Sequence, residues 1–304
     1  MRIRTQRLIQ LAAAAVLNGY AMGFAEGKIF TGPTKSVCVP VLNCYSCPGA
    51  LGACPIGALQ AAFGSSGRGF PFYVVGTLLL FGILLGRLSC GLLCPFGFIQ
   101  DLLHRIPVPK LKVPAKIDRP LRWLKYGVLA IMVIGLPAIV AAANGYAPPF
   151  FCEFLCPAGT LEAGVPLLAM DERLRSQIGW LFNWKTAVLL AIVVLSLFIH
   201  RPFCRYLCPL GGLWGLFNRF SLVQLQWAEP TCVHCGKCAK ACPMAVDPVK
   251  DQASAECIRC TTCVSVCPTN SLHLRTLLRP KASLPKDAGA TLETSSAGNP
   301  EEQA

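Results

Sequence analysis

Four long runs of apolar residues dominate the first two thirds of the chain. They are Leu8–Phe24, Phe70–Gly86, Tyr126–Ala143 and about Ile178–His200. Each approaches the roughly 20 apolar residues that are needed to cross the hydrocarbon core of a bilayer. The pattern therefore predicts an α-helical membrane protein with about four transmembrane helices. The first run is also short and ends in small residues, so a cleaved signal peptide is an alternative interpretation of it.

Basic residues cluster on one side of these runs. They precede the first run, fill the segment between the second and third, and follow the fourth, whereas loops 25–69 and 144–177 carry few of them. Cytoplasmic loops of membrane proteins are enriched in Lys and Arg. The distribution predicts a multi-pass protein of a bacterial inner (cytoplasmic) membrane, with both termini in the cytoplasm.

The C-terminal third has a different composition. Residues 223–278 are rich in cysteine and poor in bulky apolar groups, so we expect a small α+β domain that depends on bound metal to fold. Residues 279–304 are polar and small, which is typical of a disordered tail. The predicted domains are a four-span membrane domain (1–222), a ferredoxin-like domain (223–278) and the tail (279–304).

Two copies of the bacterial-ferredoxin cysteine run lie in this small domain. They read Cys232-x2-Cys235-x2-Cys238-x3-Cys242-Pro243 and Cys257-x2-Cys260-x2-Cys263-x3-Cys267-Pro268. In two-cluster ferredoxins the fourth cysteine of each run binds the other cluster. We therefore predict one [4Fe-4S] cluster on Cys232, Cys235, Cys238 and Cys267, and a second on Cys257, Cys260, Cys263 and Cys242. Zinc sites also use C-x2-C pairs, but they have no use for the third cysteine and the Cys-Pro.

A second cysteine system repeats along the apolar part. Cys-Pro-x-Gly occurs at Cys54, Cys94, Cys156 and Cys208, and the last three have a partner four residues upstream, at Cys90, Cys152 and Cys204. The membrane part therefore reads as two similar halves. Repeats of this kind usually place functional groups at their interface.

The predicted topology sorts these cysteines by membrane face. Cys90, Cys94, Cys204 and Cys208 fall on the cytoplasmic side, where four thiolates complete a further [4Fe-4S] site; unligated thiols at the membrane edge are the alternative. On the outer face, symmetry selects Cys54, Cys152, Cys156 and either Cys44 or Cys47. We predict Cys47 as the fourth ligand of this outer cluster. Two or three disulfides, involving Cys38 as well, are the alternative.

Overall composition agrees with these interpretations. Hydrophobic residues make up 54% of the chain and charged residues 14%. The net charge of +13 would suggest nucleic acid in a soluble protein, but the basic residues lie beside apolar runs, so no nucleic-acid partner is predicted. The eighteen cysteines lack the spacing of a small secreted scaffold and favour iron ligation, which at the ferredoxin runs requires a reducing compartment.

The combination of motifs resembles the NapH/MauN-type membrane ferredoxins over roughly residues 70–275. The residues that carry the resemblance are Cys90, Cys94, Pro95, Cys204, Cys208, Pro209 and the eight ferredoxin cysteines. The resemblance implies an electron-transfer protein that links the quinone pool or a cytoplasmic donor to a redox partner, such as a soluble iron–sulfur subunit or a periplasmic reductase or dehydrogenase. Quinone is then a further expected cofactor. The additional cysteines between Cys38 and Cys54 depart from the family pattern, so no specific partner is implied.

Other functions remain open from the sequence. An accessory, maturation or redox-sensing factor for a periplasmic metalloenzyme would use the same ligands. A transporter has little support, because no apolar run carries charged groups at its centre. An electron relay needs no catalytic residue, but oxidation of a quinol releases protons. Candidate proton acceptors are Asp101, His104, Glu153 and Glu162, although solvated interfacial charges are the simpler interpretation.

Clusters on the two predicted membrane faces would be far apart for direct electron transfer. A hydrocarbon core about 30 Å thick is too wide for one efficient hop between face clusters. A quinone, another subunit, or loops that dip into the bilayer must therefore link them. Leu161–Met170 is a candidate dipping loop, although an interfacial helix is the favoured interpretation.

Overall fold

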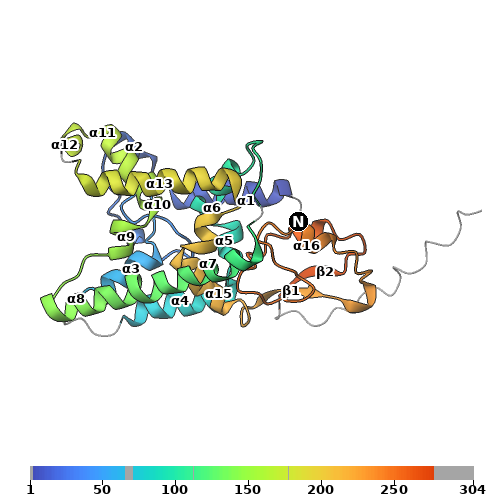
Figure 1. The fold of residues 1–304 in the computed structure, drawn as a ribbon. Helices are drawn as coiled ribbons and strands as arrows, with labels where there is room; N and C mark the ends of the chain where they lie inside the picture. The colour runs from blue at the N-terminus through green and yellow to red at the C-terminus, as the bar shows by residue number, and fades with distance from the viewer. Residues whose placement is uncertain (1–2, 66–70, 112, 177, 277–304) are drawn as a thin grey trace, which may run out of the picture.

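The structure is a computed structural model that describes residues 3–65, 71–111, 113–176 and 178–276 (Figure 1). A mostly helical part is followed by a small C-terminal domain with a two-stranded sheet. The predicted tail, 279–304, lies outside the described residues.

The helical part combines long helices with short ones that follow the cysteines. The longer elements are α1 (Ile3–Leu17), α4 (Phe72–Leu85), the continuous stretch of α7 (Ala115–Val128), the π-helical η2 (Leu129–Gly135) and α8 (Leu136–Asn144), and α13 (Trp180–Phe198). The short ones are α2 (Ala21–Glu26), η1 (Pro33–Ser36), α3 (Pro55–Phe63), α5 (Leu88–Leu92), α6 (Pro95–Leu103), α9 (Phe150–Phe154), α10 (Pro157–Gly159), η3 (Thr160–Gly164), α11 (Val165–Met170), α12 (Glu172–Arg175), α14 (Pro202–Tyr206) and α15 (Pro209–Phe217). The candidate dipping loop is therefore helical.

Two helices in the described residues are long and apolar enough to cross a membrane. They are Ala115–Asn144 and Trp180–Phe198. In the most apolar 18-residue segment of each helix, only 28% and 17% of the residues are buried, whereas the core helix of a soluble protein is mostly buried. They coincide with the third and fourth predicted spans. The second predicted span corresponds to α4, whose 14 residues rise only about 21 Å at 1.5 Å per residue. The count of four spans stays a prediction.

The first predicted span, Leu8–Phe24, is not one continuous helix. Helix α1 ends at Leu17, and α2 begins at Ala21. The Asn18 side chain donates a hydrogen bond back to Ala14 O (3.2 Å), and the N–H of Tyr20 donates to Gly49 O (3.2 Å). These bonds turn the chain toward the cysteine-rich loop 38–54, so the helical pattern is interrupted by a tertiary contact.

A single hydrophobic core contains cysteines from both predicted faces. Cys54 and Cys156 belong to the same buried cluster as Cys94 and Cys204, together with large side chains such as Trp214. Trp214, on α15, donates from Nε1 to Pro40 O (3.2 Å) and so ties α15 to the loop before α3. The cysteine loops and the short helices after them are thus folded in among the longer helices, and the assignment of the two cysteine groups to opposite membrane faces stays a prediction.

The C-terminal domain has the small α+β fold expected of a ferredoxin-like unit. Strand β1 (Val223–Trp227) pairs antiparallel with β2 (Leu272–Thr276), with Val223 opposite Thr276 and Trp227 opposite Leu272. Between the strands lie η4 (Glu229–Thr231), α16 (Lys237–Ala241) and α17 (Thr262–Ser265). Few of its described apolar residues are buried: Met244, Val246 and Ile258 form one cluster, and Leu225, Ala228 and Leu272 are buried on or beside the strands.

This domain is clamped to the helical part by buried charges. The Arg87 side chain is fully buried and donates to Ala255 O (2.6 Å) and to Glu256 Oε2 (3.1 Å), and Lys125 pairs with the same carboxylate. Arg259 of the C-terminal domain donates to Leu85 O (3.0 Å) and Asn218 O (2.7 Å) of the helical part. The two parts are therefore held together by bonds from both sides.

Candidate functional site

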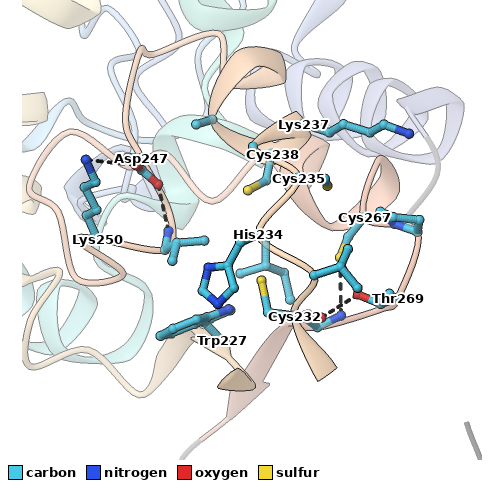
Figure 2. Close-up of a pocket in the computed structure, with 17 residues that line it drawn as sticks. Trp227, Cys232, His234, Cys235, Lys237, Cys238, Asp247, Lys250, Cys267 and Thr269 are labelled. Carbon is cyan, nitrogen blue, oxygen red and sulfur yellow. Dashed lines mark hydrogen bonds and ion pairs between the residues drawn. The ribbon is translucent and has the colours of Figure 1, made fainter. Parts of the chain in front are cut away.

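The first predicted ferredoxin set surrounds one cavity. Cys232, Cys235, Cys238 and Cys267 all line a space of about 180 Å³ beside β1 (Figure 2). His234 lies against Trp227 at the edge of this space, with ring centroids 6.0 Å apart. The structure thus brings together the four thiols that the spacing predicts, including Cys267 from the other run.

The second predicted set surrounds a smaller cavity. Cys242, Cys257, Cys260 and Cys263 line a space of about 20 Å³. The fourth cysteine again comes from the other run. Cys238 lies in α16 and Cys242 directly follows it; in the same way Cys263 lies in α17 and Cys267 follows that helix. Each of these short helices therefore connects one cavity to the other.

The two cysteine runs share one backbone conformation. Matching positions adopt left-handed φ angles, at His234 and Arg259 (49° and 53°), Gly236 and Thr261 (68° and 63°), and Ala245 and Asn270 (both 51°). Positive φ is unfavourable for most non-glycine residues. Here it accompanies N–H groups that face sulfur, since Val246 N donates to Cys242 Sγ (3.4 Å) and Ser271 N to Cys267 Sγ (3.3 Å). Such inward N–H groups stabilise anionic centres.

The Cys-Pro-x-Gly motifs also build one repeated local structure. Each motif cysteine caps a helix whose first residue is proline, at α3, α6, α10 and α15. Proline suits this position because the first helical N–H has no partner within the helix. The motif glycine donates its N–H to the cysteine Sγ at 3.4 Å in three cases, Cys94, Cys156 and Cys208. Helix starts of this kind favour negative charge on sulfur.

One group of four thiols lies next to the ferredoxin-like domain. Cys90, Cys94, Cys204 and Cys208, which we call the α6 site, are all buried. Burial raises the pKa of the Cys94 thiol, and the nearby Cys204 and Cys90 thiols raise it further. The same neighbours raise the pKa of Cys208. These four predicted residues are therefore brought together.

Two buried arginines accompany the α6 site. Arg87 donates to Cys204 O (3.1 Å) and Arg201 to Cys90 O (2.6 Å), and neither side chain is exposed. Arg201 pairs with Asp101, which also contacts His200 Nε2 (3.1 Å). Arg87 and Lys125 both pair with the single carboxylate of Glu256. Asp101 is thus an ion-pair partner, in contrast to the solvated charge that the sequence suggested.

A second group of four thiols lines a large cavity. Cys44, Cys54, Cys152 and Cys156, which we call the α3 site, border a space of about 740 Å³. Burial, then the nearby Cys152 thiol, raise the pKa of Cys54 to about 12. Glu162 accepts the N–H of Cys44 (2.7 Å), and burial raises the pKa of this carboxyl to about 7. Glu162 is therefore not a solvated charge either.

The predicted outer ligand Cys47 does not line this cavity. Its Sγ contacts the Asn18 side chain (3.6 Å), where α1 ends, whereas Cys44 faces the motif of Cys156. A Cβ added to Gly159 would lie 3.7 Å from Cys44 Sγ and 3.9 Å from Cys156 Sγ. Cys38 forms a β-bridge with Ala53 and also lies outside the cavity lining. The structure thus places Cys44 at this cavity in the position expected of Cys47, whose assignment as a ligand stays a prediction.

Two glutamines bind a cysteine sulfur in equivalent ways. Gln60 Nε2 donates to Cys152 Sγ (3.2 Å) while its Oε1 accepts the N–H of Phe151 (2.9 Å). Gln100 Nε2 donates to Cys204 Sγ (3.2 Å) while its Oε1 accepts the N–H of Phe203 (3.3 Å). The cysteine spacing alone did not predict a role for either glutamine. Their signal was the shared position, six residues after the motif cysteines Cys54 and Cys94.

The cysteine thiols are not arranged to hold a single metal ion. Across the described parts of the chain, no group of three His, Cys, Asp or Glu side chains is arranged to hold one metal ion. No disulfide joins the eighteen cysteines, all of which are described. The ferredoxin sets and the α3 site instead border open spaces, as suits a metal cluster whose iron atoms each take one thiolate.

Family comparisons identify the chemistry of these segments. A family described as "4Fe-4S binding domain" matches residues 68–114, 128–167 and 186–225, and a second family of the same description matches 254–273. Iron–sulfur clusters are therefore its cofactors. No solved structure matches the chain.

Several known proteins are similar to this chain. MauN of Paracoccus denitrificans, a methylamine utilization ferredoxin-type protein, is 31% identical over 61% of this chain and 59% of its own length. YccM of Escherichia coli K12, whose name places it in electron transport, is 30% identical over 56% of this chain and 45% of its own length. The regulatory protein NosR of Pseudomonas aeruginosa is 27% identical over 56% of this chain and 21% of its own length. The chain thus spans about half the length, or less, of these relatives.

Proposed function

Because this chain belongs to the NapH/MauN-type family of 4Fe-4S electron-transport proteins, we propose that it is a membrane-bound relay. It carries electrons between the quinone pool or a cytoplasmic donor and a redox-enzyme partner. The clusters supply one-electron chemistry at thiolate-bound iron. The chain itself supplies ligands, fixed separations and local charge.

The contact between the ferredoxin-like domain and the α6 site carries this proposal. Gly91 follows Cys90, and Ile258 follows Cys257; a Cβ on Gly91 would collide with Ile258 O. Arg87 bridges the same two sites, since it binds both Cys204 O and Ala255 O. A ligand loop of the second ferredoxin set therefore touches a ligand loop of the α6 site, which is the arrangement that electron hopping needs.

Three of the four thiol sets supply the ligands in this proposal. Cys232, Cys235, Cys238 and Cys267 bind the first ferredoxin cluster, and Cys242, Cys257, Cys260 and Cys263 bind the second. Cys90, Cys94, Cys204 and Cys208 bind a third at the α6 site. Ligation requires the thiols to lose their protons, so cluster assembly releases protons from these buried groups.

The two ends of the relay face different surroundings. Cys235 is exposed, so the first ferredoxin cluster is placed to exchange electrons with a soluble iron–sulfur partner. The α3 cavity is lined mainly by small and apolar residues and includes Lys185 of α13, one of the two membrane-length helices. Its 740 Å³ lies within the range of small-molecule sites. This supports a quinone ring at that end.

The test is reduction of the clusters by candidate donors. The full chain, purified anaerobically and placed in lipid nanodiscs, is mixed with a short-chain quinol or with a reduced soluble ferredoxin, and cluster absorbance and EPR signals are followed. We expect one of these donors to reduce the clusters that dithionite reduces. Cys260→Ala should interrupt electron exchange between the first ferredoxin cluster and the helical part, while Cys38→Ala should not. Reduction by dithionite alone would contradict a relay.

A regulatory or accessory role is the second candidate. It is favoured by the similarity to NosR, which is named a regulatory protein. Such a protein would hold the same clusters but sustain no turnover between donor and acceptor. Clusters that are reduced by a donor but never reoxidised by any acceptor protein or quinone would favour this role.

A further inference from the structure

The position six residues after a Cys-Pro-x-Gly cysteine carries a side chain that makes a long-range hydrogen bond in all four motifs. It is occupied by Gln60, Gln100, Glu162 and Trp214. Gln60 reaches Cys152 and Gln100 reaches Cys204, in each case a cysteine contributed by the other half of the chain. In two of the four motifs, the helix that starts at the motif cysteine therefore carries a glutamine that binds a sulfur of the same thiol site, whereas Trp214 donates to Pro40 O.

Glu162 occupies the equivalent position and, like Oε1 of the two glutamines, accepts a backbone N–H, here that of Cys44. It lies six residues after Cys156, and its Oε2 accepts the N–H of Cys44 (2.7 Å). Its Oε1 is buried and has no hydrogen-bond partner. By analogy with the two glutamines, this contact assigns Cys44 to the site that Cys156 belongs to.

The α3 and α6 sites are then built from equivalent parts. In each site one cysteine caps a helix that carries a buried glutamine, and a C-x3-C-P pair supplies two more. Cys90 completes the α6 site, and Cys44 takes the equivalent role at the α3 site. Cys47 is held near Asn18 and away from the cavity, so it is not part of the set.

We propose that Cys44, Cys54, Cys152 and Cys156 bind a fourth [4Fe-4S] cluster. The cavity they border, about 740 Å³, is larger than the 180 Å³ space between the first ferredoxin set. The cluster would occupy the part of the cavity between the four thiols and leave the apolar remainder free. This inference extends the proposed relay by one cluster, but its test counts iron and does not depend on electron flow.

The test compares two neighbouring cysteines in one loop. Iron, acid-labile sulfide and zinc are measured per chain on the anaerobically purified full chain, with Mössbauer spectra to count the cubanes. We expect about 16 iron atoms in the unmodified protein and about 12 in Cys44→Ala, because each cubane holds four. Cys47→Ala is the matched control and should keep all of them.

Several outcomes would overturn the proposal. They are unchanged iron in Cys44→Ala, loss of iron in Cys47→Ala instead, or zinc or a disulfide at these thiols. A count of about 12 iron atoms in the unmodified protein would exclude the fourth cluster but leave the proposed relay intact. A count of about eight would exclude the α6 cluster as well. Should Cys44→Ala fail to fold, Cys152→Ala and the count on the unmodified protein decide the question.

Discussion

Single side chains set the chemistry of the thiol sites. Gln60 and Gln100 are almost completely buried, and each satisfies both ends of its amide, one with a backbone N–H and one with a cysteine sulfur. Buried polar groups are costly unless they are paired in this way. An N–H that donates to a ligating sulfur stabilises the more negative, reduced state of a cluster. These amides are therefore expected to tune potentials.

Gln100→Leu should lower the reduction potential of the α6 cluster. One lost hydrogen bond is worth about 1 kcal/mol, which is on the order of 40 mV for a one-electron couple. The measurement is an EPR-monitored redox titration of the purified protein. Gln224→Leu, on β1 where the side chain donates to Arg219 O, is the control and should leave this potential unchanged. A potential that stays the same in both variants would argue against the role of the amide.

Short helices bring the cysteine loops together at the scale of elements. Helix α5 passes so close to the ferredoxin-like domain that only glycine fits at position 91, where a Cβ would collide with the backbone of Ile258. A backbone oxygen in a packed interface cannot move aside easily. The close approach of α5 therefore fixes the separation between two ligand loops.

Gly91→Ala should weaken the docking of the domain and slow electron exchange between the second ferredoxin cluster and the α6 cluster. Laser-flash or freeze-quench EPR on the full chain measures this rate. Gly76→Ala is the matched control, since its Cβ would meet nothing within 4 Å in α4. Equal rates in the two variants would show that the Gly91 contact has no effect on transfer.

Iron removal should unfold the C-terminal domain before the helical part. Only six of its described apolar residues are buried, so the clusters must supply much of its stability. Limited proteolysis after treatment with a chelator and an oxidant tests this expectation. Cleavage should concentrate within 223–276. Cleavage that begins in the longer helices would contradict it.

At the scale of the whole molecule, buried charges join the two parts. Glu256 pairs with both Arg87 and Lys125, whose side chains are fully buried. The pKa of Glu256 is lowered by these two cations, which outweigh the effect of its burial. Removing one partner of a buried ion pair leaves an uncompensated charge, which costs about 3–5 kcal/mol.

Glu256→Gln should therefore lower the melting temperature of the protein clearly. Differential scanning fluorimetry or calorimetry in detergent provides the measurement. Glu26→Gln removes an exposed pair with Lys28, where the two side chains are 43% and 77% exposed, and should have almost no effect. Similar melting temperatures for the two variants would show that the clamp contributes little.

The spacing of cysteines in the sequence was enough to predict the sites whose ligands lie close together in the chain. The ferredoxin ligand sets and the two C-x3-C-P pairs of the α6 site could be predicted, because their cysteines sit at fixed offsets within short turns. The break after Leu17 could not, because it depends on a bond to Gly49, distant in the chain. The place of Cys44 at the α3 site could not be predicted for the same reason, and the spacing favoured Cys47 instead. The position of Cys44 depends on Glu162, more than a hundred residues away.

The backbone contact between Gly91 and Ile258 also has a consequence in time. Attached domains usually move relative to one another unless the interface is extensive and well packed. Here the Arg87 and Arg259 clamps hold the same interface from both sides. The step between these two sites should therefore proceed at a fixed tunnelling distance, without waiting for domain rotation, and its rate should be insensitive to solvent viscosity.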